Sequence, residues 1–349
     1  MKMNVERELH IGLAFDENYL VPALVVIKSA IDTLKKDYKL VFHVVYTEKS
    51  LRKYAIKYVK DFFADEVEIE FHLVDLANKL KKIDFPSIYN ESILYRLLLP
   101  ELLHRRIDKI IWLDSDILIT NDLSELWEIP FEDKYILGAH ENNIISAYAG
   151  SGFNGYGKVH SDFGLDPDDQ VICTGVMVLN LKPLYDFQIC DRVIKFIQKY
   201  ENLLVLPDMT ALNFLLHDKI KIIHSKFNAE PDPFMAHYYG AVISDPHRYL
   251  NETIEEITSH PTVVHFSKMP KPWMYKAFPE YRHPFFDKWM ETAMNLNADD
   301  EMYHNLFDAQ IDEYRKKTQA YHDLAESVDS NKAFIYLHDP KINVRGDYV

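Results

Sequence analysis

The chain has 349 residues, of which 48% are hydrophobic, 27% are charged and 13% are aromatic. This composition excludes an intrinsically disordered protein, because the apolar residues suffice to form a core. The net charge of -15 argues against a nucleic-acid-binding protein, since binding to phosphates requires an excess of lysine and arginine. The simplest explanation of the acidic balance is solubility.

The cysteine content and the N-terminus indicate the compartment. The two cysteines, Cys173 and Cys190, make neither a disulfide framework nor a zinc cluster. Residues 1–18 carry charges where a signal peptide needs its apolar centre, and no run reaches the roughly 18 apolar residues of a membrane span. The sequence therefore predicts a cytoplasmic protein without a transmembrane segment, which makes at most peripheral contact with a membrane.

Residues 10–75 alternate between strand-like and helix-like patterns. Short apolar or alternating runs predict strands, and apolar residues at helical spacing predict helices. The strands are expected at 10–15, 39–47 and 67–75, and the helices at 20–36 and 51–64. This β-α-β-α-β order predicts parallel strands joined by right-handed crossovers.

The remainder of the chain continues the α/β pattern. Helices are expected at 91–103, with an interruption at Pro100, and at 190–202 and 208–218. Strands are expected at 109–113, 134–140, 171–184, 219–224 and 262–267. We predict one α/β domain over residues 1–296, with a mostly parallel central sheet flanked by helices. Residues 297–349 form a partly helical C-terminal appendage in this prediction.

Two carboxylates follow the buried strand at 109–113. Asp114 and Asp116 are separated by one residue, so on an extended backbone they point to the same side. Ligands of open α/β sheets bind beyond the carboxyl ends of the strands, and hard cations prefer oxygen ligands. The motif predicts a divalent-cation site. The alternative is a strand-end turn in which Asp114 only caps the local backbone.

A second enzyme class also uses a strand that ends in Asp-x-Asp. The aspartate-nucleophile phosphohydrolases place this motif in the first strand of the core and follow it closely with threonine or valine. Here the strand is a late one, and Ile117 and Leu118 follow the motif. The phosphohydrolase reading is therefore disfavoured.

A histidine and a lysine near the end of the chain complete a candidate site. His265 lies in the strand expected at 262–267, and Lys271 follows after a short turn, before Pro272 and Trp273. Histidine binds Mn²⁺, and lysine is a compact positive charge for phosphate. By itself, His265 is also compatible with a structural histidine. Together with the two aspartates, these residues predict three metal ligands and a lysine around a nucleotide diphosphate.

The motifs resemble those of the family 8 retaining glycosyltransferases, in the family's order and over about residues 9–290. The segments are AFDENY, ILYRLLLPELL, DKIIWLDSDILITNDLSELW, TGVMVLNLKPL, DMTALNFLL, SKFN and HFSKMPKPW. The resemblance implies a GT-A fold, a Mn²⁺ cofactor with Mg²⁺ as the alternative, and a UDP-sugar donor. It implies transfer of a hexose of the glucose or galactose type, with retention of configuration, to a saccharide or glycoconjugate acceptor such as one of the cell envelope.

The resemblance also implies roles for individual residues. The implied metal ligands are Asp114, Asp116 and His265. The implied donor-binding residues are Ala14, Asp16, Asn18, Arg96, Asp114, Asp208, Lys268 and Lys271. Arg96 and Asp208 are the catalytic candidates, with Asp208 the nearest candidate for a nucleophile. Attack on the same face as departure is the favoured route to retention.

Four residues in three motifs depart from the family pattern. Cys173 and Thr174 replace an Asn-Ala pair, Met209 replaces a glutamine, and Lys268 replaces a glycine. The motifs for the metal and the diphosphate match, whereas those for the sugar are altered, so the identity of the donor sugar stays open. These departures motivate the alternative of a sugar-nucleotide-binding protein without transferase activity. The acceptor is expected to contact residues 141–170, a candidate lid, and 231–240, both predicted as loops.

Overall fold

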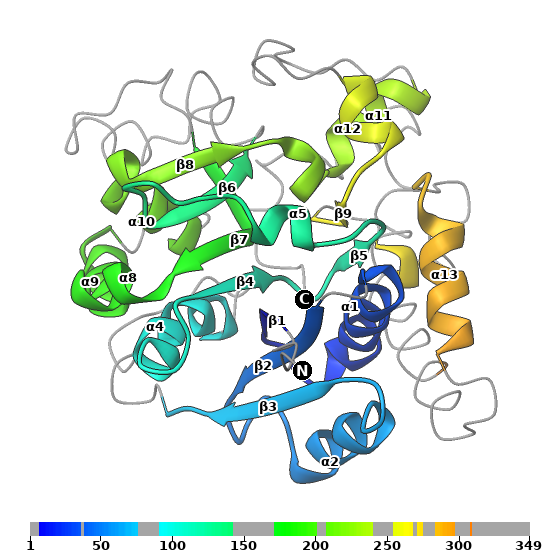
Figure 1. The fold of residues 1–349 in the computed structure, drawn as a ribbon, viewed down its shortest axis with the longest axis horizontal. Coiled ribbons are helices and arrows are strands. Elements are labelled where there is room, and N and C mark those ends of the chain that lie inside the picture. The colour runs from blue at the N-terminus through cyan, green and yellow to red at the C-terminus, as the bar shows by residue number, and fades with distance from the viewer. Residues whose placement is uncertain are drawn as a thin grey trace, which may run out of the picture.

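The computed structural model describes residues 7–35, 38–75, 91–141, 171–200, 207–239, 254–267, 271–274, 283–296 and 308. Their centre is a seven-stranded sheet with the order β3-β2-β1-β4-β7-β6-β8 (Figure 1). Its strands are β1 (Arg7–Leu13), β2 (Tyr38–Tyr46), β3 (Glu68–Leu73), β4 (Lys109–Leu113), β6 (Ile136–His140), β7 (Ile172–Asn180) and β8 (Ile220–Ile223). A separate two-stranded sheet consists of β5 (Ile117–Ile119) and β9 (Val263–His265).

The strand directions divide the main sheet into two parts. β1, β2, β3 and β4 run parallel to their neighbours within this group, which confirms the prediction for the N-terminal part. β7 is antiparallel to both β4 and β6. It ends at Asn180, earlier than predicted, because residues 181–186 form a helix. Pro183 lies in the first turn of that helix, where its missing amide proton removes no hydrogen bond.

Helices pack on both faces of the sheet. They are α1 (Leu20–Thr33), α2 (Lys53–Phe62), α4 (Leu99–Leu103), α5 (Ser124–Trp127), α8 (Leu181–Asp186), α9 (Ile189–Tyr200), α10 (Pro207–Leu215), α11 (Pro231–Tyr239), α12 (Ile254–Ser259) and α13 (Phe286–Asn295). Short 3-10 helices are η1 (Glu17–Tyr19), η2 (Glu91–Leu98), η4 (His217–Lys219), η5 (Ser225–Asn228) and η7 (Pro272–Met274). One hydrophobic core includes α1, α2 and α13, and the other includes α4, α8, α9 and α10.

Two predicted segments differ from the structure. The helix expected at 91–103 is a 3-10 helix to Leu98 and an α-helix from Leu99, so Pro100 lies in a first turn and interrupts nothing. The loop expected at 231–240 is helical from Pro231 to Tyr239. Pro231 at the first position and Asp232 in the first turn are signals of a helix start. The prediction of a loop there was wrong.

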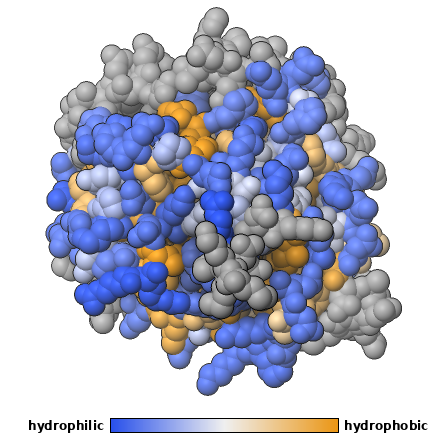
Figure 2. All heavy atoms as spheres, viewed as in Figure 1, coloured by the Kyte–Doolittle hydropathy of each residue, from blue (hydrophilic) through white to orange (hydrophobic). Residues whose placement is uncertain are grey.

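The predicted lid lies outside the described residues, except for Glu141, and the C-terminal appendage does so except for Asp308. Hydrophilic residues dominate the surface drawn in Figure 2, and the apolar ones form scattered groups. In the described ranges, no helix combines the length and the apolar composition needed to cross a membrane.

Candidate active site

The Asp-x-Asp turn lies between the two sheets. β4 ends at Leu113 and β5 begins at Ile117, so residues 114–116 connect the main sheet with the small one. β9 pairs antiparallel with β5 and sets His265 opposite Ile117. The Phe266 amide also donates to the Asp116 carbonyl at 2.9 Å. This pairing brings the histidine of a distant segment to the aspartates.

Asp114, Asp116 and His265 form a compact set of ligand atoms. Each offers one atom, and these atoms lie within 4.8 Å of one another. His265 Nε2 is 3.2 Å from Asp116 Oδ1, while its Nδ1 is 2.9 Å from the amide oxygen of Asn228. Because an amide oxygen only accepts, Nδ1 carries the proton and Nε2 is left to bind a cation. Two carboxylates and one imidazole suit Mn²⁺ or a similar divalent ion.

Lys271 adds a positive charge to this set. Its Nζ lies 2.7 Å from Asp116 Oδ2 and also donates to the Phe266 carbonyl. Burial would raise the pKa of the Asp116 carboxyl, but Lys271 and His265 outweigh it and hold that pKa below its usual value. Asp116 is therefore ionised at neutral pH and available as a ligand.

Arg96 connects the Asp-x-Asp turn with Asp208. Its Nη2 donates to Asp114 Oδ1 at 3.0 Å, its Nη1 donates to the Thr174 carbonyl, and its Nε is 3.6 Å from Asp208 Oδ2. Trp112 Nε1 donates to the same Asp114 oxygen at 2.8 Å. Burial raises the pKa of Asp114, although Arg96 opposes this effect. A buried arginine thus holds two carboxylates on one side of the site.

One carboxylate oxygen of Asp208 is ion-paired with Arg96 but accepts no hydrogen bond in the described part of the chain. Asp208 lies in the first turn of α10, only 6% of the residue is exposed, and Oδ2 has no hydrogen-bond partner in the part of the chain that the structure describes. Burial raises the pKa of this carboxyl, and Arg96 partly offsets the shift. Because Arg96 Nε at 3.6 Å is too far away for a hydrogen bond, a hydroxyl group of a ligand could still donate to this buried oxygen.

The segment after β1 lies beside the turn. Ser115 Oγ donates to the Ala14 carbonyl at 2.8 Å, which joins the two loops. The Asp16 carboxylate caps η1, where it accepts from the Asn18 and Tyr19 amides at 2.9 and 3.1 Å. Asn18 is exposed. The structure therefore brings these three predicted residues to the carboxyl end of β1, whereas Lys268 lies outside the described residues.

Two of the departures from the family pattern line the buried side of the site. Cys173 Sγ lies 4.0 Å from His265 Nδ1. Burial raises the pKa of this thiol well above its usual value. Met209, beside Asp208, is also buried.

Three residues that support the site received no role from the sequence. Asn228 orients His265, Trp112 binds Asp114, and Gly175 makes room for the imidazole. A Cβ atom on Gly175 would lie 2.2 Å from His265 Cε1. A glycine inside the apolar run at 171–184 was a usable signal, because such a glycine marks a close approach.

Comparisons with known proteins show what this chain is similar to. The sequence profile of glycosyl transferase family 8 matches residues 10–277. The chain is 25% identical over 287 residues to the lipopolysaccharide 1,2-glucosyltransferase of Escherichia coli, which covers 78% of this chain and 75% of that protein. It is 26% identical over 233 residues to general stress protein A of Bacillus subtilis (strain 168), and this match covers 66% of this chain and 75% of that protein.

A solved structure is similar over most of the chain. The galactosyltransferase LgtC, in complex with donor and acceptor sugar analogs, has a TM-score of 0.67 at 20% identity, and the match covers 85% of this chain and 100% of that one. The predicted fold, a GT-A fold with a mostly parallel sheet flanked by helices, is confirmed.

Proposed function

The chain belongs to glycosyl transferase family 8, and we propose that it moves a hexose from a UDP-sugar to a saccharide or glycoconjugate acceptor, with retention of configuration. The proposal rests on the convergence of Asp114, Asp116, His265 and Lys271 at the carboxyl end of β4. The names of the glucosyltransferase and galactosyltransferase relatives support a hexose of the glucose or galactose type.

The metal and diphosphate half of the site would stabilise the leaving group. Asp114, Asp116 and His265 would hold Mn²⁺ or Mg²⁺, which supplies positive charge beside the diphosphate. Lys271, at 2.7 Å from Asp116, provides a second positive charge there. Asn228 keeps His265 Nε2 directed at Asp116. Charge that develops on the UDP group as the glycosidic bond breaks is thus met by groups already in position.

The sugar half would be formed by Arg96 and Asp208. Asp208 Oδ2, which accepts no hydrogen bond in the described part of the chain, is suited to accept a hydroxyl hydrogen from the donor sugar, and Arg96 Nε lies 3.6 Å from it. We favour attack on the same face as departure, with Asp208 as the nearest candidate for a nucleophile in a two-step route. Cys173 and Met209 make the buried wall less polar than an asparagine and a glutamine would.

The test is release of UDP from a panel of UDP-sugars by the purified chain with Mn²⁺. We expect turnover with at least one UDP-hexose. In Asp116→Ala this turnover should fall by more than about 1000-fold, because the variant lacks the carboxylate that pairs with both Lys271 and His265. Asp61→Ala, which removes an exposed aspartate paired with Lys57, is the control and should keep full activity.

Asp116→Asn separates a lost charge from a damaged fold, since the amide nearly preserves the shape of the carboxylate. Both variants should retain the far-UV circular dichroism of the parent. Unchanged turnover in a folded Asp116 variant would overturn the metal assignment. Tight binding of a UDP-sugar without release of UDP for any sugar would favour the second candidate, a sugar-nucleotide-binding protein. Cys173 and Met209 motivate this alternative.

A further inference from the structure

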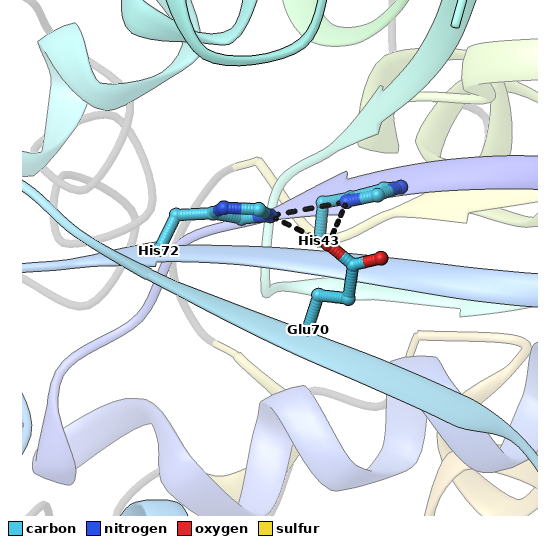
Figure 3. A group of neighbouring side chains, drawn as sticks. All are labelled: His43, Glu70 and His72. Carbon is cyan, nitrogen blue, oxygen red and sulfur yellow. Dashed lines mark hydrogen bonds and ion pairs between the residues drawn. The ribbon is translucent and has the colours of Figure 1, made fainter. Parts of the chain in front are cut away.

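A second cluster of possible ligands lies on the other side of β1 from the Asp-x-Asp turn. Figure 3 shows His43 on β2 with Glu70 and His72 on β3, the edge strand of the main sheet. The parallel register sets His43 opposite Glu70 and Val45 opposite His72. Because residues two apart on a strand share a face, the three side chains project from the same face of the sheet.

The distances among the three ligand atoms match a small cation. His43 Nδ1 and His72 Nε2 are 3.1 Å apart, and each is 3.7 Å from Glu70 Oε2. A circle through three atoms with these separations has a radius of about 2.0 Å, close to zinc–nitrogen and zinc–oxygen bond lengths. A cation near its centre would need only small shifts of the side chains and could take water as a fourth ligand.

The contacts of His43 indicate which of its ring nitrogens faces the proposed ligand. His43 is 1% exposed. His43 Nε2 lies 3.1 Å from His10 Nδ1, and His10 Nε2 lies 3.5 Å from Glu8 Oε2.

A consistent arrangement of protons follows from these contacts. His43 Nε2–H donates to His10 Nδ1, and His10 Nε2–H points at the Glu8 carboxylate. His43 Nδ1 then presents a lone pair to His72 Nε2. A neutral His72 can meet this lone pair with an Nε2–H that donates at 3.1 Å, and a cation bound between the two nitrogens would take the place of that proton. A metal-bound histidine whose other nitrogen donates to an acceptor is the usual arrangement at metal centres.

Arg106 fixes the carboxylate of the cluster. Its Nη1 and Nη2 donate to the two oxygens of Glu70 at 2.8 and 2.6 Å. These hydrogen bonds lower the pKa of Glu70, which is therefore ionised. The Glu70 side chain is 25% exposed, so the cluster is open to solvent from this side.

We propose that His43, His72 and Glu70 form a second cation site, selective for a borderline divalent ion such as Zn²⁺, which fastens the edge strand β3 to β2. Two imidazoles and one carboxylate favour Zn²⁺ over Mn²⁺ and Mg²⁺, whereas the Asp-rich set at the end of β4 favours the harder ions. The site is independent of the proposed transferase activity.

The experiment is calorimetric titration of the full chain with Zn²⁺. The Asp116→Ala variant disables the candidate metal centre at the end of β4 and should still bind Zn²⁺ at the cluster of His43, Glu70 and His72. In that background, His72→Gln should weaken Zn²⁺ binding by more than about 100-fold, and His10→Ala, which removes the acceptor of the His43 N–H, by about 10-fold to 100-fold. The control is His260→Ala, which removes an exposed histidine directly after α12. It should bind Zn²⁺ as the parent does.

The thermal midpoint provides an independent readout of the same site. Zn²⁺ should raise the midpoint of Asp116→Ala and of the His260→Ala control, but not that of His72→Gln, because a ligand stabilises only the state it binds. Glu70→Gln replaces His72→Gln if the latter fails to fold, as judged by circular dichroism. Equal Zn²⁺ affinity in the folded cluster variants and the control would overturn the site.

Discussion

One missing side chain, that of Gly175, makes the candidate metal set possible. His265 packs directly on this residue of β7, and a Cβ atom would overlap its ring at 2.2, 2.8 and 3.0 Å from Cε1, Nδ1 and Nε2. The ring has little freedom to move away, because Nδ1 is held by Asn228. The position of Nε2 relative to Asp116 therefore depends on a glycine that offers no side-chain ligand.

Gly175→Ala should raise the Mn²⁺ concentration needed for half-maximal turnover by about 10-fold to 100-fold, as loss of other orienting contacts does at metal centres. Mn²⁺ titrations of UDP release measure this value. Gly12→Ala is the matched control on β1, where the new Cβ would meet the mobile end of Leu99 at 2.8 Å. We expect that control to lose about 1–3 kcal/mol of stability through overpacking, with an unchanged Mn²⁺ requirement. An equal shift in both variants would contradict the role of Gly175.

At the scale of elements, the pairing of β5 with β9 assembles the site. Each strand has only three residues, so neighbouring segments must hold the pair in place. On the β9 side, the Ala229 amide donates to the Val263 carbonyl at 2.8 Å, and the His265 amide to the Ala229 carbonyl at 3.0 Å. On the β5 side, the buried Ile119 amide donates to Ser29 Oγ of α1 at 3.1 Å.

Ser29→Ala should lower the free energy of unfolding by about 1–3 kcal/mol, because the buried Ile119 amide would lose its acceptor. Urea denaturation measures the change. Thr292→Ala is the control, since it deletes an exposed hydroxyl that donates only to the Lys288 carbonyl within α13. The control should change stability by less than about 0.5 kcal/mol. A Ser29 variant as stable as this control would refute the support that we assign to α1.

At the scale of the molecule, the C-terminal part of the described chain closes over the small sheet and α1. α13 packs beside α1 (Figure 1), and the ring of Trp289 lies 5.3 Å from that of Trp273. His283, just before α13, lies among the rings of Phe234, Phe266 and Phe285 at 4.6, 4.9 and 6.2 Å. A histidine in this apolar surrounding connects the stability of the domain with pH.

Burial lowers the pKa of His283 to about 3, below the value near 6.5 of an unfolded chain. As the pH falls below about 6.5, the unfolded chain takes up the proton first, so the free energy of unfolding decreases until the pH nears 3. His43, with a pKa of about 3, contributes in the same direction.

His283→Asn should therefore reduce the loss of stability between about pH 7 and about pH 5 by about 1–2 kcal/mol. The asparagine oxygen can still accept from the Phe285 amide, which donates to His283 Nδ1 at 3.2 Å. Any cavity left by the smaller side chain acts equally at both pH values and cancels in the difference. Urea denaturation at both pH values measures the free energy of unfolding. A pH dependence of stability identical to that of the parent would contradict the role of His283.

Much of this protein follows from short-range information in the chain. The apolar runs and helical spacings predicted most strands and helices, because these patterns depend on neighbouring residues. The chemistry of Asp114, Asp116, His265 and Lys271 was readable from residue type and from their positions at strand ends. The errors lie at element ends, as at Asn180, and in residues 231–239, where the helix-start signal was overlooked.

Only the tertiary structure decided which distant groups meet. The antiparallel direction of β7, the approach of His265 to Gly175 and the alignment of His43 with His72 each depend on register between separate segments. Register is determined by the packing of whole strands and helices on one another, and a shift of one residue would turn these side chains to the opposite face. The sequence by itself thus determined the chemical groups and the α/β plan, and the packing of the strands determined the distances on which the proposed metal binding depends.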